Sequence, residues 1–306
     1  MRRRSLVLAL AAASLAAVPA LAGVAAADKP ELAPGTHPGA SNGVVYQYSR
    51  GQAPPNRGGG SGSPNMTYHN GPIMASSKTA AIFWGPKWAN STFTGDKMTG
   101  LDTWYAGFGG SPYAATSSEY TGVGGSVGTA SDYTGHLTDF STASGGQNTS
   151  AILAEVSKMI TNPVANGYYA VYVDLPRRNA GYCAWHSHGT VGGVGVQFAF
   201  FWNLDGDPGC DPQDTTTNHS QGLAALANVS GHELSEAMTD PSLNAWYDGS
   251  GQENGDKCAW SFGAPSVTFS NGSQWKIQGE WSNAAYTSGK GGYANLSGQK
   301  GCLSGQ

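Results

Sequence analysis

Short apolar runs alternate with helical spacings of apolar residues along the middle of the chain. The runs at 78–84, 168–175 and 194–202 are rich in Val, Ile, Phe and Tyr, and each predicts a buried strand. Gly85-Pro86 ends the first run. The segment 113–140 has no helical spacing and is rich in Gly, Ser, Thr and Tyr, so it predicts strands joined by long loops.

Apolar residues three or four positions apart predict three helices, at 98–108, 149–160 and 218–239. Asn162-Pro163 and Asp240-Pro241 end the last two, because the residue before a proline avoids the helical conformation. The third helix has an apolar stripe formed by Leu223, Ala227, Leu234 and Met238. Such a stripe packs one face of the helix and leaves the other face to line a cleft.

Strands that alternate with helices predict an α/β fold, a mixed sheet with packed helices. Beyond residue 244 the chain has only short strand and turn signals, including those at 266–270 and 274–278. We therefore expect a β-rich C-terminal portion that follows the α/β part of the chain.

The first 27 residues have the parts of a secretory signal peptide. Three arginines precede an apolar run, and the small residues Ala25-Ala26-Ala27 provide a cleavage site. A retained membrane anchor is the alternative, since the run approaches spanning length. Arg3-Arg4 also permits twin-arginine export. We therefore predict a secreted protein, extracellular or associated with a cell wall.

Residues 28–72 are rich in Pro, Gly and Ser and contain few apolar residues. Such a segment buries too little apolar surface to offset the entropy of ordering, so it predicts a disordered spacer. Order is expected to begin near Ala75, and a single globular domain occupies 73–306.

The charge of the chain excludes some partners. The formal net charge is −4, and removal of residues 1–27 takes away three arginines and no acids, which leaves −7. A mildly acidic chain without basic runs is a poor ligand for nucleic acid. No second apolar stretch is long enough to span a membrane. We expect a monomer that meets no membrane after signal cleavage.

The four cysteines all lie in the C-terminal part of the chain. In an exported protein they predict two disulfides, for which three pairings are possible. We favour Cys183 with Cys210 and Cys258 with Cys302, because each pair closes a loop of moderate length. A zinc site of cysteines is disfavoured, since no C-x-x-C spacing occurs.

The candidate for chemistry is His232-Glu233-Leu234-Ser235-Glu236 on the third helix. Positions four apart share one helix face, so His232 and Glu236 can bind one metal ion. In the related H-E-x-x-H pattern the intervening glutamate is the general base, a role that Glu233 takes here. The pattern predicts a helix like the active-site helix of zincins. The alternative is a buried, satisfied histidine with solvated glutamates.

A third ligand has to come from the acidic segment that follows the helix. Glu253 is the first choice and Asp256 the second. The cofactor that we expect is zinc. One imidazole and two carboxylates form a harder site than two imidazoles, so manganese and calcium also remain candidates.

A second histidine pattern is His186-Ser187-His188, whose histidines are spaced to share one side of a strand. It offers additional ligands in principle. We interpret the pair instead as exposed loop residues, the more common setting for such a pattern.

Several short stretches resemble the exordium or phosphate-induced protein family, and their order along the chain matches too. They are Ile82-Phe83-Trp84-Gly85, Gly181-Tyr182-Cys183-Ala184-Trp185-His186-Ser187, Thr239-Asp240-Pro241, Ala245-Trp246-Tyr247-Asp248 and Gly301-Cys302. The resemblance implies an extracellular or cell-wall protein without an assigned reaction. The plant-type members share this context without the His-Glu pair, so this chain would belong to a bacterial-type branch, and only its own residues predict the metal site.

Two functions follow as hypotheses. The first is a secreted zinc-dependent hydrolase, a peptidase acting on extracellular peptides or proteins, with ligands His232, Glu236 and Glu253 and with Glu233 as general base. The second is a non-catalytic exordium-like protein that binds a partner or a glycan of the cell wall. A calcium-stabilised structural protein without turnover is a further alternative.

Overall fold

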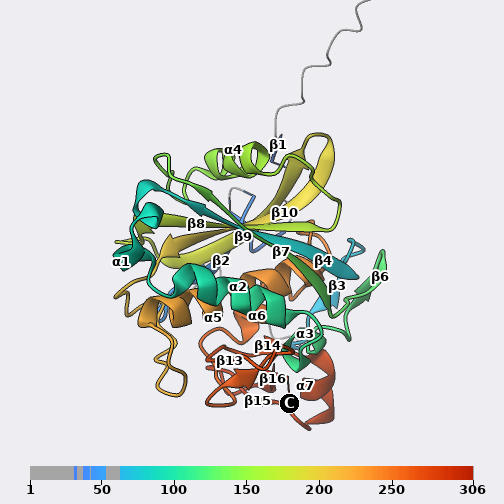
Figure 1. Ribbon diagram of the computed structural model, residues 1–306. Coiled ribbons are helices and arrows are strands. Elements are labelled where there is room, and N and C mark those ends of the chain that lie inside the picture. Colours follow the sequence, from blue (N-terminus) through green and yellow to red (C-terminus); the bar gives the residue numbers. More distant parts are fainter. Residues whose placement is uncertain (1–30, 33–36, 42, 53–62, 306) are drawn as a thin grey trace, which may run out of the picture.

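The computed structural model describes residues 31–32, 37–41, 43–52 and 63–305. The predicted signal peptide, 1–27, lies outside these residues. A seven-stranded sheet occupies the centre of the molecule (Figure 1). Its strands are β1 (Glu31–Leu32), β2 (Val45–Tyr48), β4 (Ser76–Trp84), β7 (Ala130–Asp139), β8 (Gly167–Pro176), β9 (Tyr182–Val191) and β10 (Val194–Asn203).

The sheet is mixed, as predicted. Its order is β1-β9-β10-β8-β4-β7, and β2 also pairs with β9. Strands β7, β4, β8 and β10 run parallel, whereas β9 is antiparallel to β10, β1 and β2. The turn between β9 and β10 is Gly192-Gly193, with φ of 55° and 78°, which only glycine adopts without strain. This hairpin places β9 beside the predicted strand β10.

Helices cover both faces of the sheet (Figure 1). The helix α4 (Thr149–Met159) packs on one face, and α2 (Lys97–Phe108) and α5 (Gln221–Thr239) pack on the other. Because both faces are covered, the central strand β8 is buried from residue 167 to 174, which explains its continuous apolar run. The three predicted helices and the strands β4, β8 and β10 are confirmed.

The remaining elements are short. The helical ones are a 3₁₀ helix η1 (Pro86–Ala89), α1 (Ser91–Thr94), α3 (Pro112–Ala115), α6 (Asn254–Lys257) and α7 (Asn283–Ser288). The strands are β3 (Thr67–Tyr68), β5 (Thr121–Gly122), β6 (Gly125–Ser126), β11 (Trp246–Tyr247), β12 (Val267–Thr268), β13 (Gln274–Trp275), β14 (Glu280–Trp281), β15 (Tyr293–Ala294) and β16 (Lys300–Leu303). The C-terminal portion therefore consists of small sheets with two short helices, against the side of α5 away from the central sheet (Figure 1).

Two disulfides cross-link this fold, with the predicted pairing. Cys183 of β9 is joined to Cys210, and Cys258, directly after α6, is joined to Cys302 of β16. Their Cα atoms are 5.8 Å apart in both pairs, within the normal range. The second bond fixes the end of α6 to the C-terminal sheet. Disulfides are typical of proteins in an oxidising compartment.

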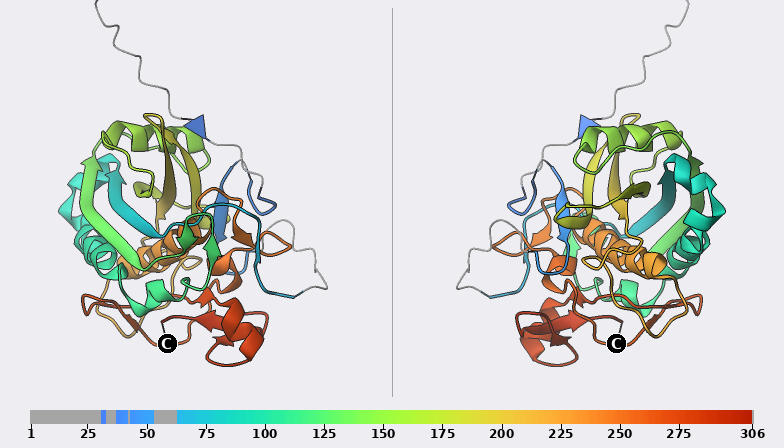
Figure 2. Two further views of the ribbon diagram at one scale, coloured as in Figure 1. Left: turned by 90° about the vertical axis from the view of Figure 1, so that its right-hand side faces the viewer. Right: turned by 90° about the vertical axis from the view of Figure 1, so that its left-hand side faces the viewer.

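The described part of the predicted spacer is packed on the domain, so the prediction of disorder is wrong there. Strand β2 pairs with β9, and Val44 and Val45 are buried. Figure 2 shows these N-terminal strands along the side of the sheet. Composition missed this because backbone pairing with a sheet edge needs few apolar residues. Order therefore begins well before Ala75.

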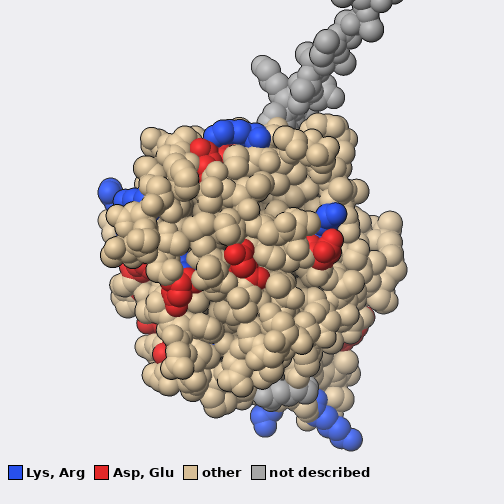
Figure 3. Space-filling view, in the orientation of Figure 1, with Lys and Arg blue, Asp and Glu red and all other residues tan. Residues whose placement is uncertain are grey.

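The surface has few charged groups. On the face shown in Figure 3, Lys and Arg residues occur singly, with no continuous basic patch among the described residues visible there. Within the same described ranges, no helix is both long enough and apolar enough to cross a membrane.

Candidate metal centre

The helix α5 carries His232, Glu233 and Glu236, and all three side chains are fully buried. Ser220 caps the start of the helix by accepting a hydrogen bond from the Leu223 N–H group at 3.2 Å. The predicted open face of this helix does not exist in the described structure. Strands β9 and β10 lie on one side of α5, and α2 and α6 lie against it elsewhere.

His232 and Glu236 meet as the sequence predicts. His232 Nε2 lies 3.0 Å from Glu236 Oε1, one helical turn away. The two atoms do not form a hydrogen bond, and Nε2 has no other partner among the described residues. Gln278 Nε2 donates to the Gly255 carbonyl at 2.9 Å and lies 3.0 Å from His232 Nδ1, which fixes the ring. An imidazole nitrogen and a carboxylate oxygen that lie this close without a hydrogen bond are typical of two ligands of one metal ion.

The chain after α5 returns three carboxylates to the helix. Asp240 Oδ1 accepts backbone hydrogen bonds from Asn244 and Ala245 at 2.6 and 2.7 Å, which forms the turn. Glu253 directly precedes α6, and Asp256 lies within its first turn. The Asp256 N–H group donates to Glu236 Oε1 at 2.9 Å, so α6 is held directly against the helix.

The structure places the two candidate third ligands differently. Asp256 Oδ1 lies 3.7 Å from His232 Nε2 and groups with His232 and Glu236. Glu253, the first choice, groups instead with His37 and Asp240. The geometry therefore favours the second choice, Asp256, as the partner of His232 and Glu236.

Two histidines that the sequence analysis did not select complete the site. His186 lies on β9 and is buried, so the interpretation as an exposed loop residue is wrong. Its Nδ1 is 3.1 Å from Glu233 Oε2, and its Nε2 is 3.6 Å from Glu253 Oε1. The strand spacing of His186 and His188 was the available signal. His37 comes from the predicted spacer, where no local pattern marked it.

These residues form one continuous group, which we call the His/acid cluster. Its members are His37, His186, His232, Glu233, Glu236, Asp240, Glu253 and Asp256. Three sets of three within it have ligand atoms within 4.8 Å of one another. Of the eight side chains, only that of Asp256 has appreciable exposure, 15%.

The cluster combines five carboxyl groups with three imidazoles and lacks a basic partner. No lysine or arginine of the described chain forms an ion pair with it, and the nearby Lys257 pairs with Asp248 at 2.6 Å. A buried carboxylate is unfavourable without a compensating positive charge. The cluster therefore requires protons or a cation.

The pKa values express the same imbalance. Burial raises the pKa of Glu253 and Asp256 well above the usual range and that of Asp240 to about 7. Burial alone would lower the pKa of His232, but the Glu236 carboxylate outweighs it and raises the value to about 10. The carboxylates likewise raise the pKa of His186 to about 9. At His186 and His232 the carboxylates thus outweigh the effect of burial, so a positive charge is favoured there.

The unpartnered atoms of the cluster are of the kinds that bind metal ions. Within the His/acid cluster, the buried atoms without a hydrogen-bond partner are His37 Nε2, His186 Nε2, His232 Nε2, Glu233 Oε1, Glu236 Oε2, Asp240 Oδ2 and both oxygens of Glu253. Native proteins leave few such atoms, and a concentration of them is typical of a site that binds an ion. Imidazole nitrogen and carboxylate oxygen are ligands of zinc and manganese. The residues present therefore fit a divalent metal.

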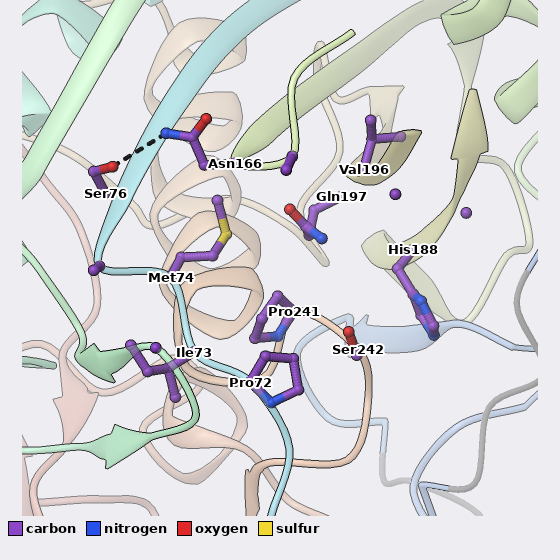
Figure 4. Close-up of a pocket in the computed structure, with 15 residues that line it drawn as sticks. Pro72, Ile73, Met74, Ser76, Asn166, His188, Val196, Gln197, Pro241 and Ser242 are labelled. Carbon is purple, nitrogen blue, oxygen red and sulfur yellow. Dashed lines mark hydrogen bonds between the residues drawn. The ribbon is translucent and has the colours of Figure 1, made fainter. Parts of the chain in front are cut away.

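A cavity of about 540 Å³ is lined by residues that are close in sequence to members of the cluster (Figure 4). His188 of β9 and Gln197 of β10 line one side, and Pro241 and Ser242, directly after Asp240, line another. His188 is two residues from His186 and so faces the same side of the sheet. No cluster residue itself lines the cavity, so the cavity offers space next to the cluster.

Comparison with protein-family models, with curated proteins and with solved structures finds no match to this chain. The resemblance to the exordium family therefore stays a prediction. The interpretation of the site rests on the residues of this chain.

Proposed function

We propose that this protein is a secreted, zinc-dependent hydrolase that cleaves peptide bonds in extracellular substrates. One observation carries the proposal: His232 Nε2, Glu236 Oε1 and Asp256 Oδ1 converge within 4.8 Å in a buried, acidic site that pairs with no lysine or arginine of the described chain. The same helix also supplies Glu233, so a ligand pair and a general base occur on adjacent turns, as in zincins.

The proposed ligands are His232, Glu236 and Asp256. A cation on His232 Nε2 moves the ring proton to Nδ1, and this requires Gln278 to turn its amide oxygen toward the ring. The donor set of one nitrogen and two oxygens also suits manganese and calcium. Asp256 keeps contact with solvent, which gives water a route to the site.

Glu233 is the proposed general base. Its Oε2 accepts a hydrogen bond from His186 Nδ1, which orients the carboxyl group, and its Oε1 is unpartnered. Burial raises the pKa of Glu233, which brings it closer to the range useful for accepting a proton near neutral pH. Bound zinc would polarise the scissile carbonyl and make water more acidic. Glu233 would then remove the proton from the attacking water and deliver it to the leaving amine.

The cavity beside His188 is the proposed place for substrate residues that flank the cleaved bond. It is large enough for a few side chains, and Pro241 and Ser242 connect its wall directly to Asp240 of the cluster. Movement of the surrounding segments has to admit the scissile bond itself, because most ligand side chains are fully buried.

That burial also favours a second candidate function. In an exordium-like cell-wall protein without catalytic activity, the cluster would hold a structural cation, and the exposed surface would bind a partner or glycan. Structural metal sites are closed, whereas catalytic ones keep an open position.

Peptide hydrolysis by the Glu233→Gln variant separates the two functions. The wild-type protein should cleave members of a fluorogenic peptide library in the presence of zinc. Loss of a general base should reduce the rate at least 100-fold while zinc stays bound. Glu119→Gln, at an exposed glutamate, is the matched control and should keep full activity. Full activity in Glu233→Gln would refute the base assignment, and a zinc-loaded wild type that cleaves nothing would favour the non-catalytic protein.

A further inference from the structure

The geometry points to a second divalent-cation site, formed by His37, Asp240 and Glu253 with His186 as a fourth donor, which fastens the N-terminal segment 37–48 to the domain. This site is separate from the proposed hydrolytic ligands and does not depend on them. Its donor chemistry selects a small divalent ion such as zinc or manganese.

The donor atoms converge on Glu253. Its Oε1 lies 3.5 Å from His37 Nε2 and 3.6 Å from His186 Nε2. Asp240 Oδ2 lies 3.8 Å from His37 Nε2. The side chains are at most 1% exposed. Ligand atoms at these separations surround a point that one metal ion can occupy.

Every inward atom of this set lacks a hydrogen-bond partner in the described chain. Both oxygens of Glu253 are unpartnered, as are Asp240 Oδ2 and the Nε2 atoms of His37 and His186. The other polar atoms are in use. Asp240 Oδ1 holds the turn after α5, and His186 Nδ1 bonds to Glu233. The atoms without a hydrogen bond are therefore the ones that face the proposed metal position. The hydrogen bonds made by the other atoms of these side chains fix the orientation of each side chain.

His37 is held in place by contacts of its own segment. The Gly39 N–H group donates to His37 Nδ1 at 3.0 Å, and the ring meets Tyr247 edge-on at 4.0 Å. Gly39 lies so close to Gly251 that an added Cβ would come within 2.2 Å of the Gly251 carbonyl oxygen. A cation on Nε2 moves the ring proton to Nδ1, and the hydrogen bond from the Gly39 N–H group is then lost. Coordination of the metal ion compensates for the loss of this one hydrogen bond.

The site explains why a segment of low-complexity composition is ordered. Strand β2 begins with Val45 opposite His186, so the segment is anchored at β9 as well as at His37. A cation at His37 would add a cross-link between this segment and the chain after α5. The segment then forms one side of the His/acid cluster instead of a spacer.

Zinc titration of the metal-free, full-length mature protein tests this inference by calorimetry. The wild type should bind two zinc ions per chain, and His37→Ala should bind one. His232→Ala should also bind one, because it removes only the other site. His69→Ala is the matched control, since His69 stacks on the same Tyr247 ring at 3.6 Å but contributes no ligand, and it should bind two. Glu253→Gln repeats the test with a near-isosteric side chain, and circular dichroism reports folding.

The outcomes separate the two sites. One zinc in the wild type that persists in both His37→Ala and Glu253→Gln but is lost in His232→Ala would overturn the second site and leave the proposed hydrolase intact. One zinc lost in His37→Ala and retained in His232→Ala would support the second site and refute the hydrolytic one. No zinc in the wild type would overturn both.

Discussion

His232 Nε2 and Glu236 Oε1 lie 3.0 Å apart on successive turns of α5, yet they form no hydrogen bond. An imidazole and a carboxylate in such contact normally share a proton along the ring plane. Asp256 Oδ1 lies 3.7 Å from the same ring nitrogen, so two carboxyl groups lie close to it. This relationship is the local basis for the proposal of a metal ion in the His/acid cluster.

The disulfide at α6 should contribute strongly to stability. It joins Cys258 to Cys302 across 44 positions, and a cross-link of that length lowers the entropy of the unfolded chain by an amount worth about 4 kcal/mol. The double variant Cys258→Ala/Cys302→Ala should therefore lose about 4 kcal/mol in urea denaturation. A loss below about 1 kcal/mol would show that residual structure or native strain cancels the entropic effect.

The substitution Gly39→Ala should be enough to detach the N-terminal segment from the domain. Gly39→Ala introduces a Cβ that would overlap the Gly251 backbone, so the segment 37–48 should become sensitive to limited proteolysis. Gly249→Ala is the matched control, because nothing lies within 4 Å of its added Cβ, and it should be cleaved no faster than wild type. Intact-mass analysis identifies the cleaved bonds. Equal protection of Gly39→Ala and wild type would mean that the contact does not hold the segment.

The stability of the domain should depend on pH through Glu155 of α4. Burial, aided by the nearby Asp139 carboxylate, raises the pKa of Glu155 from 4.5 to about 7. The folded state thus binds this proton more tightly than the unfolded state, so the contribution of Glu155 to stability falls as pH rises from 4.5 to 7 and is constant above.

Thermal unfolding of Glu155→Gln measures this effect. The difference in melting temperature, variant minus wild type, should rise between pH 5 and 7 and then level off. The wild type loses stability over this range because Glu155 becomes charged in a buried position, whereas glutamine stays neutral. The exposed control Glu119→Gln should show a constant difference. A Glu155→Gln difference that is independent of pH would contradict the raised pKa.

Much of the fold is predictable because buried strands and helices have regularly spaced apolar residues in the sequence. The strands β4, β8 and β10 have covered faces and therefore appear as continuous apolar runs. The helices α4 and α5 end near Asn162-Pro163 and Asp240-Pro241, where proline restricts the backbone. The disulfide pairing also follows from loop length in this chain.

The N-terminal strand and β9 were not predictable in this way. Strand β9 contains His186, Ser187 and His188, and polar residues in the interior of a strand have no regular apolar pattern. His186 is buried where carboxylates from α5 and from the chain after α5 surround it. Such an environment depends on contacts between distant segments.

The site was predictable only as far as it is local. His232, Glu233 and Glu236 lie on one helix, so their spacing alone brings them together. The choice between Glu253 and Asp256 depends on how α6 docks, which the Asp256 N–H bond to Glu236 decides. His37 lies more than 200 positions before its partners Asp240 and Glu253, and no spacing rule connects residues so far apart.

Elemental analysis of the mature protein, secreted and purified without chelators, tests the metal centre most directly. The account predicts at least one equivalent of zinc or another divalent metal per chain, and one equivalent fewer in the folded His232→Ala variant. Absence of metal from the wild-type protein, or an equal content in the variant, would contradict it.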